Sequence, residues 1–503
     1  MFLLNKLKRI ANNLATPSGT LSQKILKGGF WVFFLRVVNR GFSLIRLIVL
    51  ARVLSPNDFG LMGIALLTMS TLETFSQTGF QQALIQKKEN VESYLNSAWT
   101  VLILRGFILF IILYFIAPYA AIFFGAPEAK SIIRVIGFSI LFQAFTNIGV
   151  IYFQKELEFN REFIYQFSGT LADFIVSISA VLILRNVWAL VFGLLAGNMM
   201  RALVSYLVHP YRPHLSKCLG KAKELFGFGK WIMSSSILIF LIAQGDDIFV
   251  GKLLGTTALG FYQMAYRISN MPATEITHVI SQVTFPAYSK LQDNIPKLRE
   301  AYLKVLQLTA FLSFPIAGLI FVLAPDFTEI FLGEKWIPMV PAMQILTLYG
   351  AIRSIGATTG PVFQGVGKPN ILAKLSFIQL LMMIFFIYPL TNKYGIFGTA
   401  VAIIIPNLIT QTIAGIKVCN IMKCDACKFI KALLFPLISI SILILLLHIF
   451  ISNQKHMDIT IFVILLIFSG VTYLGIAHLF KNLFGYDKIV MLVKLLGKKG
   501  NSR

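Results

Sequence analysis

Three arginines lie within one apolar stretch, residues 31–60, which is long enough to cross a bilayer. At about 100° per residue, Arg36, Arg40 and Arg46 fall with Asn39 on one stripe of a helix. An arginine at the centre of a membrane costs about 2.5–3.5 kcal/mol on insertion scales. Three on one face therefore predict a water-filled or protein-lined interior. Guanidinium groups in such an interior are suited to binding phosphate through paired hydrogen bonds.

The same stretch returns 200 residues later, at positions 231–260, and the two copies align without a gap. The paired positions include Trp31 with Trp231, Arg46 with Asp246, and Gly60 with Gly260. The chain therefore contains two related halves. A helix that both halves share carries opposite charge at one position.

Each half also presents a polar stripe on its second predicted helix, again at positions 200 residues apart. Matching stripes predict a shared aqueous cavity, whereas helix packing through small and hydroxyl side chains is the alternative. The candidate polar residues of the cavity are Asn39, Glu73, Thr74, Gln77, Asn270, Thr274 and His278. Its candidate basic residues are Arg36, Arg40, Arg46, Arg267 and Arg353.

Three aspartates lie in apolar surroundings: Asp173 near mid-membrane, and Asp246 with Asp247 near the outer end of a helix. A carboxylate at such a place either carries a coupling proton or cation, or completes a structural ion pair. For Asp246 the sequence favours an ion pair with Arg46, while for Asp173 both interpretations stay open. These three residues are the candidates for ion coupling or gating.

Four further arginines, Arg105, Arg134, Arg185 and Arg201, lie near predicted helix ends. Long basic side chains at such positions commonly reach out to lipid headgroups. We therefore expect these four to contact the membrane surface rather than the cavity.

The composition is that of a membrane protein: 57% of the 503 residues are hydrophobic, 13% are charged, and the mean hydropathy is +0.77. Apolar runs of about 20 residues indicate helices rather than a barrel. We predict an all-α polytopic protein with fourteen transmembrane helices, at residues 28–50, 59–80, 97–117, 131–153, 164–184, 187–208, 229–250, 257–285, 301–323, 340–362, 371–391, 396–418, 430–451 and 459–480.

Lysine and arginine concentrate in alternate loops, which places both termini in the cytoplasm. Six helices then match six in the same orientation, a parallel-repeat architecture found in transporters. The predicted parts are a basic interfacial N-terminus (1–27), an N-lobe (28–208), a cytoplasmic linker (209–228), a C-lobe (229–418), two extra helices (419–480) and a basic cytoplasmic tail (481–503).

The net charge of +24 lies in short loops, where anionic headgroups and topology account for it. Nucleic-acid binding is therefore not expected. Cys424 and Cys427 form a single CxxC, which is a weak metal signal, and no cofactor or metal is expected. The sequence contains no Walker A loop, HExxH or GxSxG motif, so we expect a transporter and not an enzyme.

Several motifs give the chain a family resemblance. They are GGFW (28–31), LARVLSPNDFGLMGIA (50–65), GFQQALIQKKE (79–89), FGFGKW (226–231), LGTTALGFYQMAYRI (254–268) and TFPAYSKLQ (284–292). With them the sequence resembles the polysaccharide transporter branch of the multidrug/oligosaccharidyl-lipid/polysaccharide flippase superfamily, whose members include flippases for O-antigen, capsule and teichuronic acid precursors.

The resemblance implies a multi-pass protein of the bacterial inner (cytoplasmic) membrane. Such a protein flips undecaprenyl-diphosphate-linked oligosaccharide repeat units by alternating access between two six-helix lobes, for cell-surface polysaccharide and lipopolysaccharide biosynthesis. It further implies that the last two helices form a groove for the polyprenyl tail. The partners expected are this lipid-linked oligosaccharide, the bilayer, an H⁺ or Na⁺ counter-ion, and the polysaccharide polymerase or chain-length machinery.

Two other classes of protein stay open. A small-molecule or cation antiporter of the same superfamily should have acidic cavity faces, whereas this cavity is biased towards basic residues. A membrane-embedded glycan polymerase or transferase should carry catalytic carboxylates on a sizeable outer loop, but the predicted outer loops are short.

Overall fold

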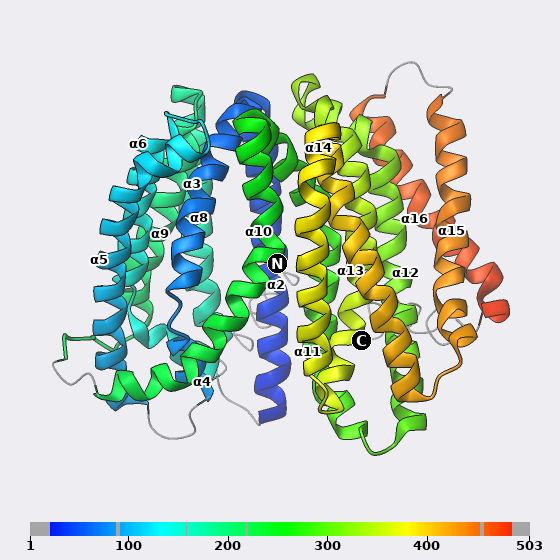
Figure 1. Cartoon of the computed structure of the whole chain (residues 1–503), viewed down its shortest axis with the longest axis horizontal. Coiled ribbons are helices and arrows are strands. Elements are labelled where there is room, and N and C mark those ends of the chain that lie inside the picture. Colours follow the sequence, from blue (N-terminus) through cyan, green and yellow to red (C-terminus); the bar gives the residue numbers. More distant parts are fainter. Residues whose placement is uncertain (1–20, 87–90, 157, 217–219, 453–456, 485–503) are drawn as a thin grey trace, which may run out of the picture. The chain divides into compact units, whose positions relative to one another are not determined.

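A computed structural model describes residues 21–86, 91–156, 158–216, 220–452 and 457–484. Over these ranges the regular structure is helical, and no strand occurs in them, so the described part of the chain has the predicted all-α class (Figure 1). The chain divides into two compact units. Unit 1 comprises residues 1–244 with 255–257, and unit 2 comprises residues 245–254 with 258–503.

Unit 1 consists of long helices and three short elements, α4, η1 and α7. Its elements are α2 (Leu21–Val53), α3 (Pro56–Phe75), α4 (Phe80–Gln86), α5 (Glu92–Phe123), α6 (Ala129–Ala144), η1 (Ile148–Val150), α7 (Ile151–Lys155), α8 (Phe159–Leu184), α9 (Trp188–Val208) and the first part of α10 (Gly220–Ser269). The α2 helix begins at Leu21, within the predicted interfacial segment. Residues 1–20 of that segment lie outside the described part of the chain.

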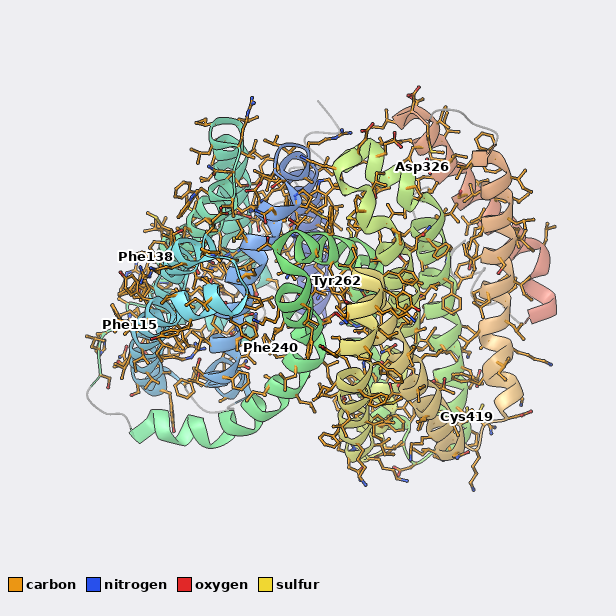
Figure 2. All side chains as sticks on the ribbon, turned by 45° about the horizontal axis from the view of Figure 1, so that its top comes forward. Phe115, Phe138, Phe240, Tyr262, Asp326 and Cys419 are labelled. Atoms are coloured by element: carbon orange, nitrogen blue, oxygen red, sulfur yellow. The ribbon has the colours of Figure 1, made fainter. Side chains whose placement is uncertain are left out.

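Unit 2 continues from α10. Its elements are α11 (Met271–Leu291), α12 (Ile295–Phe327), η2 (Thr328–Leu332), η3 (Glu334–Met339), α13 (Val340–Gly365), α14 (Asn370–Met422), α15 (Ala426–Ser452) and α16 (Ile459–Phe484). Asp326, in the last turn of α12, and Cys419, near the end of α14, lie at opposite ends of this unit (Figure 2). The α12 helix and the second limb of α14 therefore run in opposite directions.

Two of these helices fold back on themselves at a glycine. Gly255 in α10 (φ 85°, ψ −175°) and Gly395 in α14 (φ 59°, ψ −141°) leave helical geometry, in a region that only glycine enters readily. Thr391 and Thr399 lie on either side of Gly395, and their hydroxyl oxygens are 2.9 Å apart. Eight residues along a straight helix would separate them by about 12 Å. Each break therefore divides one long helix into two limbs.

Small residues let α8 and α9 approach closely. The α9 helix carries Gly193 and Gly197 four positions apart, the spacing by which membrane helices pack backbone against backbone. A side chain at Gly197 would come within 2.9 Å of the carbonyl oxygen of Gly169 on α8, and one at Gly193 within 2.6 Å of an Asp173 oxygen. The glycines thus bring α9 directly against the acidic residue of α8.

Aromatic rings join α2 to α8 over several turns. Neighbouring ring centroids lie between 4.9 and 5.5 Å apart, a separation typical of favourable edge and offset contacts. The contributing rings are Trp31, Phe34 and Phe42 on α2 with Phe163, Phe167 and Phe174 on α8. This ladder fixes the rotation of the arginine-bearing helix within unit 1.

The two C-terminal helices pack on the body of unit 2. A buried cluster includes Phe311 of α12, Phe435 of α15 and Tyr473 of α16. The Tyr473 hydroxyl donates to the Phe311 carbonyl oxygen at 3.0 Å. Because these contacts include both α15 and α16, the pair predicted as additional helices belongs to the same packed unit as α12.

Large apolar side chains cover much of the outer surface of the bundles. Phe115 on α5 and Phe138 on α6, both labelled in Figure 2, are 67% and 45% exposed. Apolar exposure on this scale is costly in water and normal in hydrocarbon. The described chain has seven helices long and apolar enough to span a membrane, or eight if the bent pair α6 and α7 is one span.

This number is below the fourteen predicted helices for two reasons. One of the seven is α14, whose 53 residues would extend about 80 Å if straight but fold into two limbs. In addition, α2, α3, α10 and α13 are not among the seven. They carry most of the candidate charged and polar residues, so the residues that suggest a site also lower the hydropathy of their helices.

The first part of the predicted linker, residues 209–216, is an extended segment that lies against unit 1. Its Tyr211 carbonyl accepts a hydrogen bond from the Asn147 side chain at 2.6 Å, and its Tyr211 hydroxyl donates to Asn96 Oδ1 at 2.7 Å. Helix α10 already begins at Gly220. We name residues 209–216 the strap.

The serine-proline motif of the sequence is a helix start. Ser55 is the N-cap of α3, its hydroxyl oxygen accepts from the Asp58 N–H, and the Asp58 carboxylate accepts from the Ser55 N–H. Pro56 occupies the first helical turn, where no N–H is needed. The motif thus fixes where the second membrane helix begins.

Gly60, one turn into α3, faces backbone. A methyl group at Gly60 would collide with the carbonyl oxygen of Thr256, and the Thr256 hydroxyl donates to the side-chain oxygen of Asn57. Within unit 1, Asn57 and Gly60 of the first motif therefore contact Thr256 of its repeat.

We predict that Gly60→Ala destabilises the protein, because backbone atoms must move to admit the methyl group. Overpacking of this kind costs about 1–3 kcal/mol. The matched control is Gly470→Ala, since Gly470 on α16 has open space around its Cα. Thermal unfolding in detergent should show a lower Tm for Gly60→Ala and an unchanged or higher Tm for the control. Equal Tm values for the two variants would contradict the contact.

Candidate functional site

The arginine stripe predicted from the sequence lies on one helix. Arg36, Asn39, Arg40 and Arg46 all belong to α2 and are half-buried. The side-chain oxygen of Asn39 is buried and lacks a hydrogen-bond partner among the described residues. Polar atoms of this kind are costly in an apolar bundle unless water or a ligand reaches them.

Arg46 is held by Asp173 of α8. Its Nη2 lies 2.9 Å from Asp173 Oδ1, and its Nε donates to the Ser177 hydroxyl at 2.8 Å. The two charged side chains are only 17% and 25% exposed. The sequence favoured Asp246 as the partner of Arg46, whereas the carboxylate that Arg46 contacts in the structure belongs to unit 1.

The close packing of α9 explains why this ion pair is enclosed. Gly193 places α9 backbone against Asp173 and Ser177, where any larger residue would displace them. With α2 on one side and α9 on the other, Asp173 lies between helices and is 25% exposed. The ion pair gives Asp173 a structural role in unit 1, and its role in ion coupling stays a prediction.

Unit 2 contains a second acidic cluster, formed by the two limbs of α10. The Tyr262 hydroxyl, whose residue is labelled in Figure 2, donates to Asp246 Oδ2 at 2.6 Å. The Gln263 amide donates to Asp247 Oδ2 at 3.0 Å. Asp246 and Asp247 are both buried. Two adjacent buried carboxylates repel each other when both are ionised, which favours a shared proton or a bound cation.

Aromatic and basic side chains extend this cluster towards α13. The rings of Tyr262, Tyr266 and Tyr349 lie in a row with centroids 6.5 and 6.2 Å apart. Arg353 Nη1 lies 3.5 Å from the Tyr266 hydroxyl oxygen. Arg353 was a candidate from its mid-span position, and the structure brings it to the row of tyrosines beside Asp246.

The other predicted polar residues are dispersed within their units. Glu73 and Thr74 are half-buried near the end of α3, and Gln77 follows that helix, which ends at Phe75. In unit 2, Arg267 and Thr274 are exposed. His278 lies on α11, and its side chain is outside the described part of the structure.

Asn270 lies where α10 gives way to α11. Its side-chain oxygen is buried without a hydrogen-bond partner among the described residues, and a methyl group at Gly350 would lie 3.5 Å from it. Pro272 lies in the first turn of α11, a position that favours the start of a helix. The predicted single helix at 257–285 is therefore interrupted at Asn270.

We expected Arg105 to contact headgroups, but its guanidinium binds the end of α3. Its Nη2 donates to the Glu73 carbonyl oxygen at 2.9 Å, and its Nε donates to the Ser76 carbonyl oxygen at 2.8 Å. These carbonyls lie at the C-terminal end of α3, where a positive charge also interacts favourably with the helix dipole. Arg201 likewise turns inward, donating to Asn198 Oδ1 at 3.1 Å beside Gly169.

Unit 1 contains a cavity of about 280 Å³ that the sequence did not indicate. It lies where α6 and α7 meet at a bend of 69°, and its walls also come from α4, α5 and α8. We name it the bend cavity. Its polar lining residues are Gln81, Gln143, Thr146, Asn147, Gln154, Glu162, Tyr165 and Gln166. Because they come from several separate segments, no local spacing in the sequence could have revealed it.

Metal and cysteine chemistry find little support in the described residues. No group of three or more His, Cys, Asp or Glu side chains there could hold a metal ion. Cys419 and Cys424 are free thiols, and the Cys427 side chain lies outside the described part. The CxxC motif stays a weak indication of a metal site.

The described part of the chain consists of long helices with an apolar outer surface, and its charges are gathered on a few of them. These features are those of an integral membrane protein. Its fold is similar to that of the lipid II flippase MurJ in an inward closed conformation. The two chains superpose with a TM-score of 0.73 at 15% identity, over 91% of this chain and 99% of MurJ.

Relatives with known names come from polysaccharide biosynthesis. The lipopolysaccharide biosynthesis protein WzxC of Escherichia coli K12 is 25% identical over 371 residues, 73% of this chain and 75% of WzxC. The teichuronic acid biosynthesis protein TuaB of Bacillus subtilis is 28% identical over 296 residues, 58% of this chain and 61% of TuaB. The family profile described as "Polysaccharide biosynthesis protein" matches residues 49–341. The chain belongs to this family.

We predict that the Arg46–Asp173 pair is energetically coupled. Replacing either residue alone leaves a poorly solvated charge and should cost about 3–5 kcal/mol, whereas removing both should cost much less. The variants are Arg46→Leu, Asp173→Leu and the double variant, with Arg52→Leu on the exposed end of α2 as control. Thermal unfolding should give a double variant that is more stable than either single one. Additive losses would mean that the two side chains act independently.

Proposed function

We propose that the protein is a flippase that moves undecaprenyl-diphosphate-linked oligosaccharide repeat units across the bacterial cytoplasmic membrane by alternating access. In this proposal the translocated repeat units are used for cell-surface polysaccharide biosynthesis. Family membership, the names of the relatives and the MurJ-like fold support a flippase role. The observation that carries the substrate is the arginine stripe of α2.

The stripe suits a diphosphate because guanidinium stays charged and offers paired N–H donors to phosphate oxygens. Arg36 and Arg40 lie closer than Arg46 to the N-terminal end of α2, which the positive-inside rule assigns to the cytoplasmic side. Arg46 lies six residues beyond Arg40 and is paired with Asp173. We therefore assign diphosphate binding to Arg36, Arg40 and Arg267, and a positioning role to Arg46.

The topology in this proposal has fourteen crossings with both termini in the cytoplasm. In this count α10 contributes two crossings, the second of them continued by α11, and α14 contributes two, while α6 with α7 counts as one. The lobes are residues 28–208 and 229–418, joined by the linker 209–228. Residues 419–480 supply the pair of helices for the polyprenyl tail, and contact with polymerase or chain-length machinery stays a prediction.

A counter-ion is the second part of the proposal. Asp246 and Asp247 are buried side by side, and their described contacts are to neutral donors, Tyr262 and Gln263. A proton or Na⁺ would relieve the repulsion between the two carboxylates. A small-molecule antiporter would use the same pair, so the pair does not distinguish the two functions, whereas the arginines do.

We predict that Arg40→Ala and Arg267→Ala each slow translocation at least tenfold, since a lost charged hydrogen bond weakens binding by about 1.5–3 kcal/mol. The measurement uses proteoliposomes loaded with undecaprenyl-diphosphate-linked oligosaccharide and a glycan-specific lectin outside. Arg52→Ala on the same helix is the control and should keep the wild-type rate. Unchanged rates for both cavity variants would disprove arginine recognition of the diphosphate.

We also predict that translocation depends on an ion gradient through the two aspartates. Ionophores that collapse the H⁺, Na⁺ or electrical gradient in turn should slow wild-type transport for at least one gradient. Asp246→Asn with Asp247→Asn should abolish that sensitivity, while Asp293→Asn in an exposed loop should preserve it. Wild-type transport that is indifferent to every ionophore would exclude coupling.

A further inference from the structure

The bend cavity has a chemistry different from that of the arginine stripe. None of its lining residues is lysine or arginine. Carboxamides predominate, and each offers two N–H donors and a carbonyl acceptor. Such a lining does not neutralise a phosphate or an acidic sugar, but it matches ligands that carry several hydroxyl groups.

One carboxylate in the cavity has a vacant acceptor. Gln154 Nε2 donates to Glu162 Oε1 at 2.8 Å, while Glu162 Oε2 is buried and has no hydrogen-bond partner among the described residues. Buried acceptors are nearly always satisfied by protein, water or ligand. A ligand hydroxyl in the bend cavity would satisfy this oxygen.

Apolar faces complete the lining. Phe80 and Phe153 contribute rings, and Tyr165 contributes a ring with a polar end. Small-molecule sites typically combine apolar and aromatic walls with a few polar groups that fix orientation. The volume of about 280 Å³ is near the lower end of such sites, which suits a single ring rather than a chain of sugars.

The bend that forms the cavity is held from outside by α9 and the strap. The Asn147 N–H donates to the Ser205 hydroxyl of α9 at 2.9 Å, and the Asn147 side chain donates to the Tyr211 carbonyl of the strap. His209 packs against Gly149 and stacks on Tyr152 with centroids 5.5 Å apart. The Tyr211 N–H donates to His209 Nδ1 at 3.1 Å, and burial lowers the pKa of His209. The cavity is therefore preformed by fixed backbone.

We propose that the bend cavity binds one sugar residue that carries no negative charge, through its hydroxyl groups. This inference rests on the proposed function in that the sugar would come from the transported glycan. The segments around the cavity include the end of α6 and the start of α8, which the positive-inside rule assigns to the cytoplasmic side. The cavity would then select the glycan at loading, apart from the arginines that bind the diphosphate.

The test measures binding of free sugars to the full-length protein in nanodiscs, which requires no transport. The probes are methyl glucoside, methyl galactoside and methyl N-acetylglucosaminide, compared with glucuronate and inorganic phosphate, by saturation-transfer NMR. At least one neutral sugar should bind, and glucuronate and phosphate should not compete with it. Failure of all three neutral sugars to bind, or equal competition by glucuronate, would overturn the proposal.

The variants locate the binding. Glu162→Gln should weaken sugar binding at least tenfold, and Val150→Phe, which fills the cavity from another wall, should abolish it. The matched control Glu156→Gln lies on the exposed end of the same bend and should bind as wild type. If Glu162→Gln lowers the Tm, Val150→Phe decides the result. Wild-type affinity in the cavity variants would refute the site.

The outcome is distinguishable from failure of the proposed function. Sugar binding that is lost in Glu162→Gln, in a protein that does not move the lipid-linked oligosaccharide, would support the cavity and reject the substrate. Translocation that depends on Arg40, in a protein whose cavity variants bind sugar normally, would support the function and reject the cavity.

Discussion

The structure depends on the cost of placing charge among apolar helices. In unit 1 the guanidinium of Arg46 is tolerated because Asp173 and Ser177 meet it, and these two are in place because Gly193 lets α9 approach α8. The aromatic ladder then fixes α2 in rotation, so the remaining arginines of the stripe share one face. The ion pair and the ladder thus set the orientation of the whole stripe.

The same constraint acts differently in unit 2. There the charge is negative, the neighbouring donors are a tyrosine hydroxyl and a glutamine amide, and the two aspartates are adjacent. Arg46 contacts an aspartate of its own unit, while Asp246, at the repeated position, accepts from a tyrosine of unit 2. The repeated position therefore has a different charge and a different kind of partner in each unit.

Much of the fold follows from the sequence, because apolar length and periodicity report directly on membrane helices. The break at Gly255 also falls between two helices that the pattern predicted as separate. The partner of Arg46 could not be predicted, because it lies 127 residues away and depends on how α8 packs. Arg105 was misjudged since helix capping and headgroup contact use the same residue type at the same place. The bend cavity could not be predicted from the sequence, because residues from several separate helices line it.

The most direct test of the central claim is a competition between substrate classes in one preparation of the wild-type protein. Proteoliposomes would hold undecaprenyl-diphosphate-linked oligosaccharide, the same lipid without the diphosphate, and a cationic drug, with transport of each measured separately. The flippase account predicts movement of the diphosphate-linked oligosaccharide alone. Transport of the cation with no movement of the oligosaccharide would contradict it.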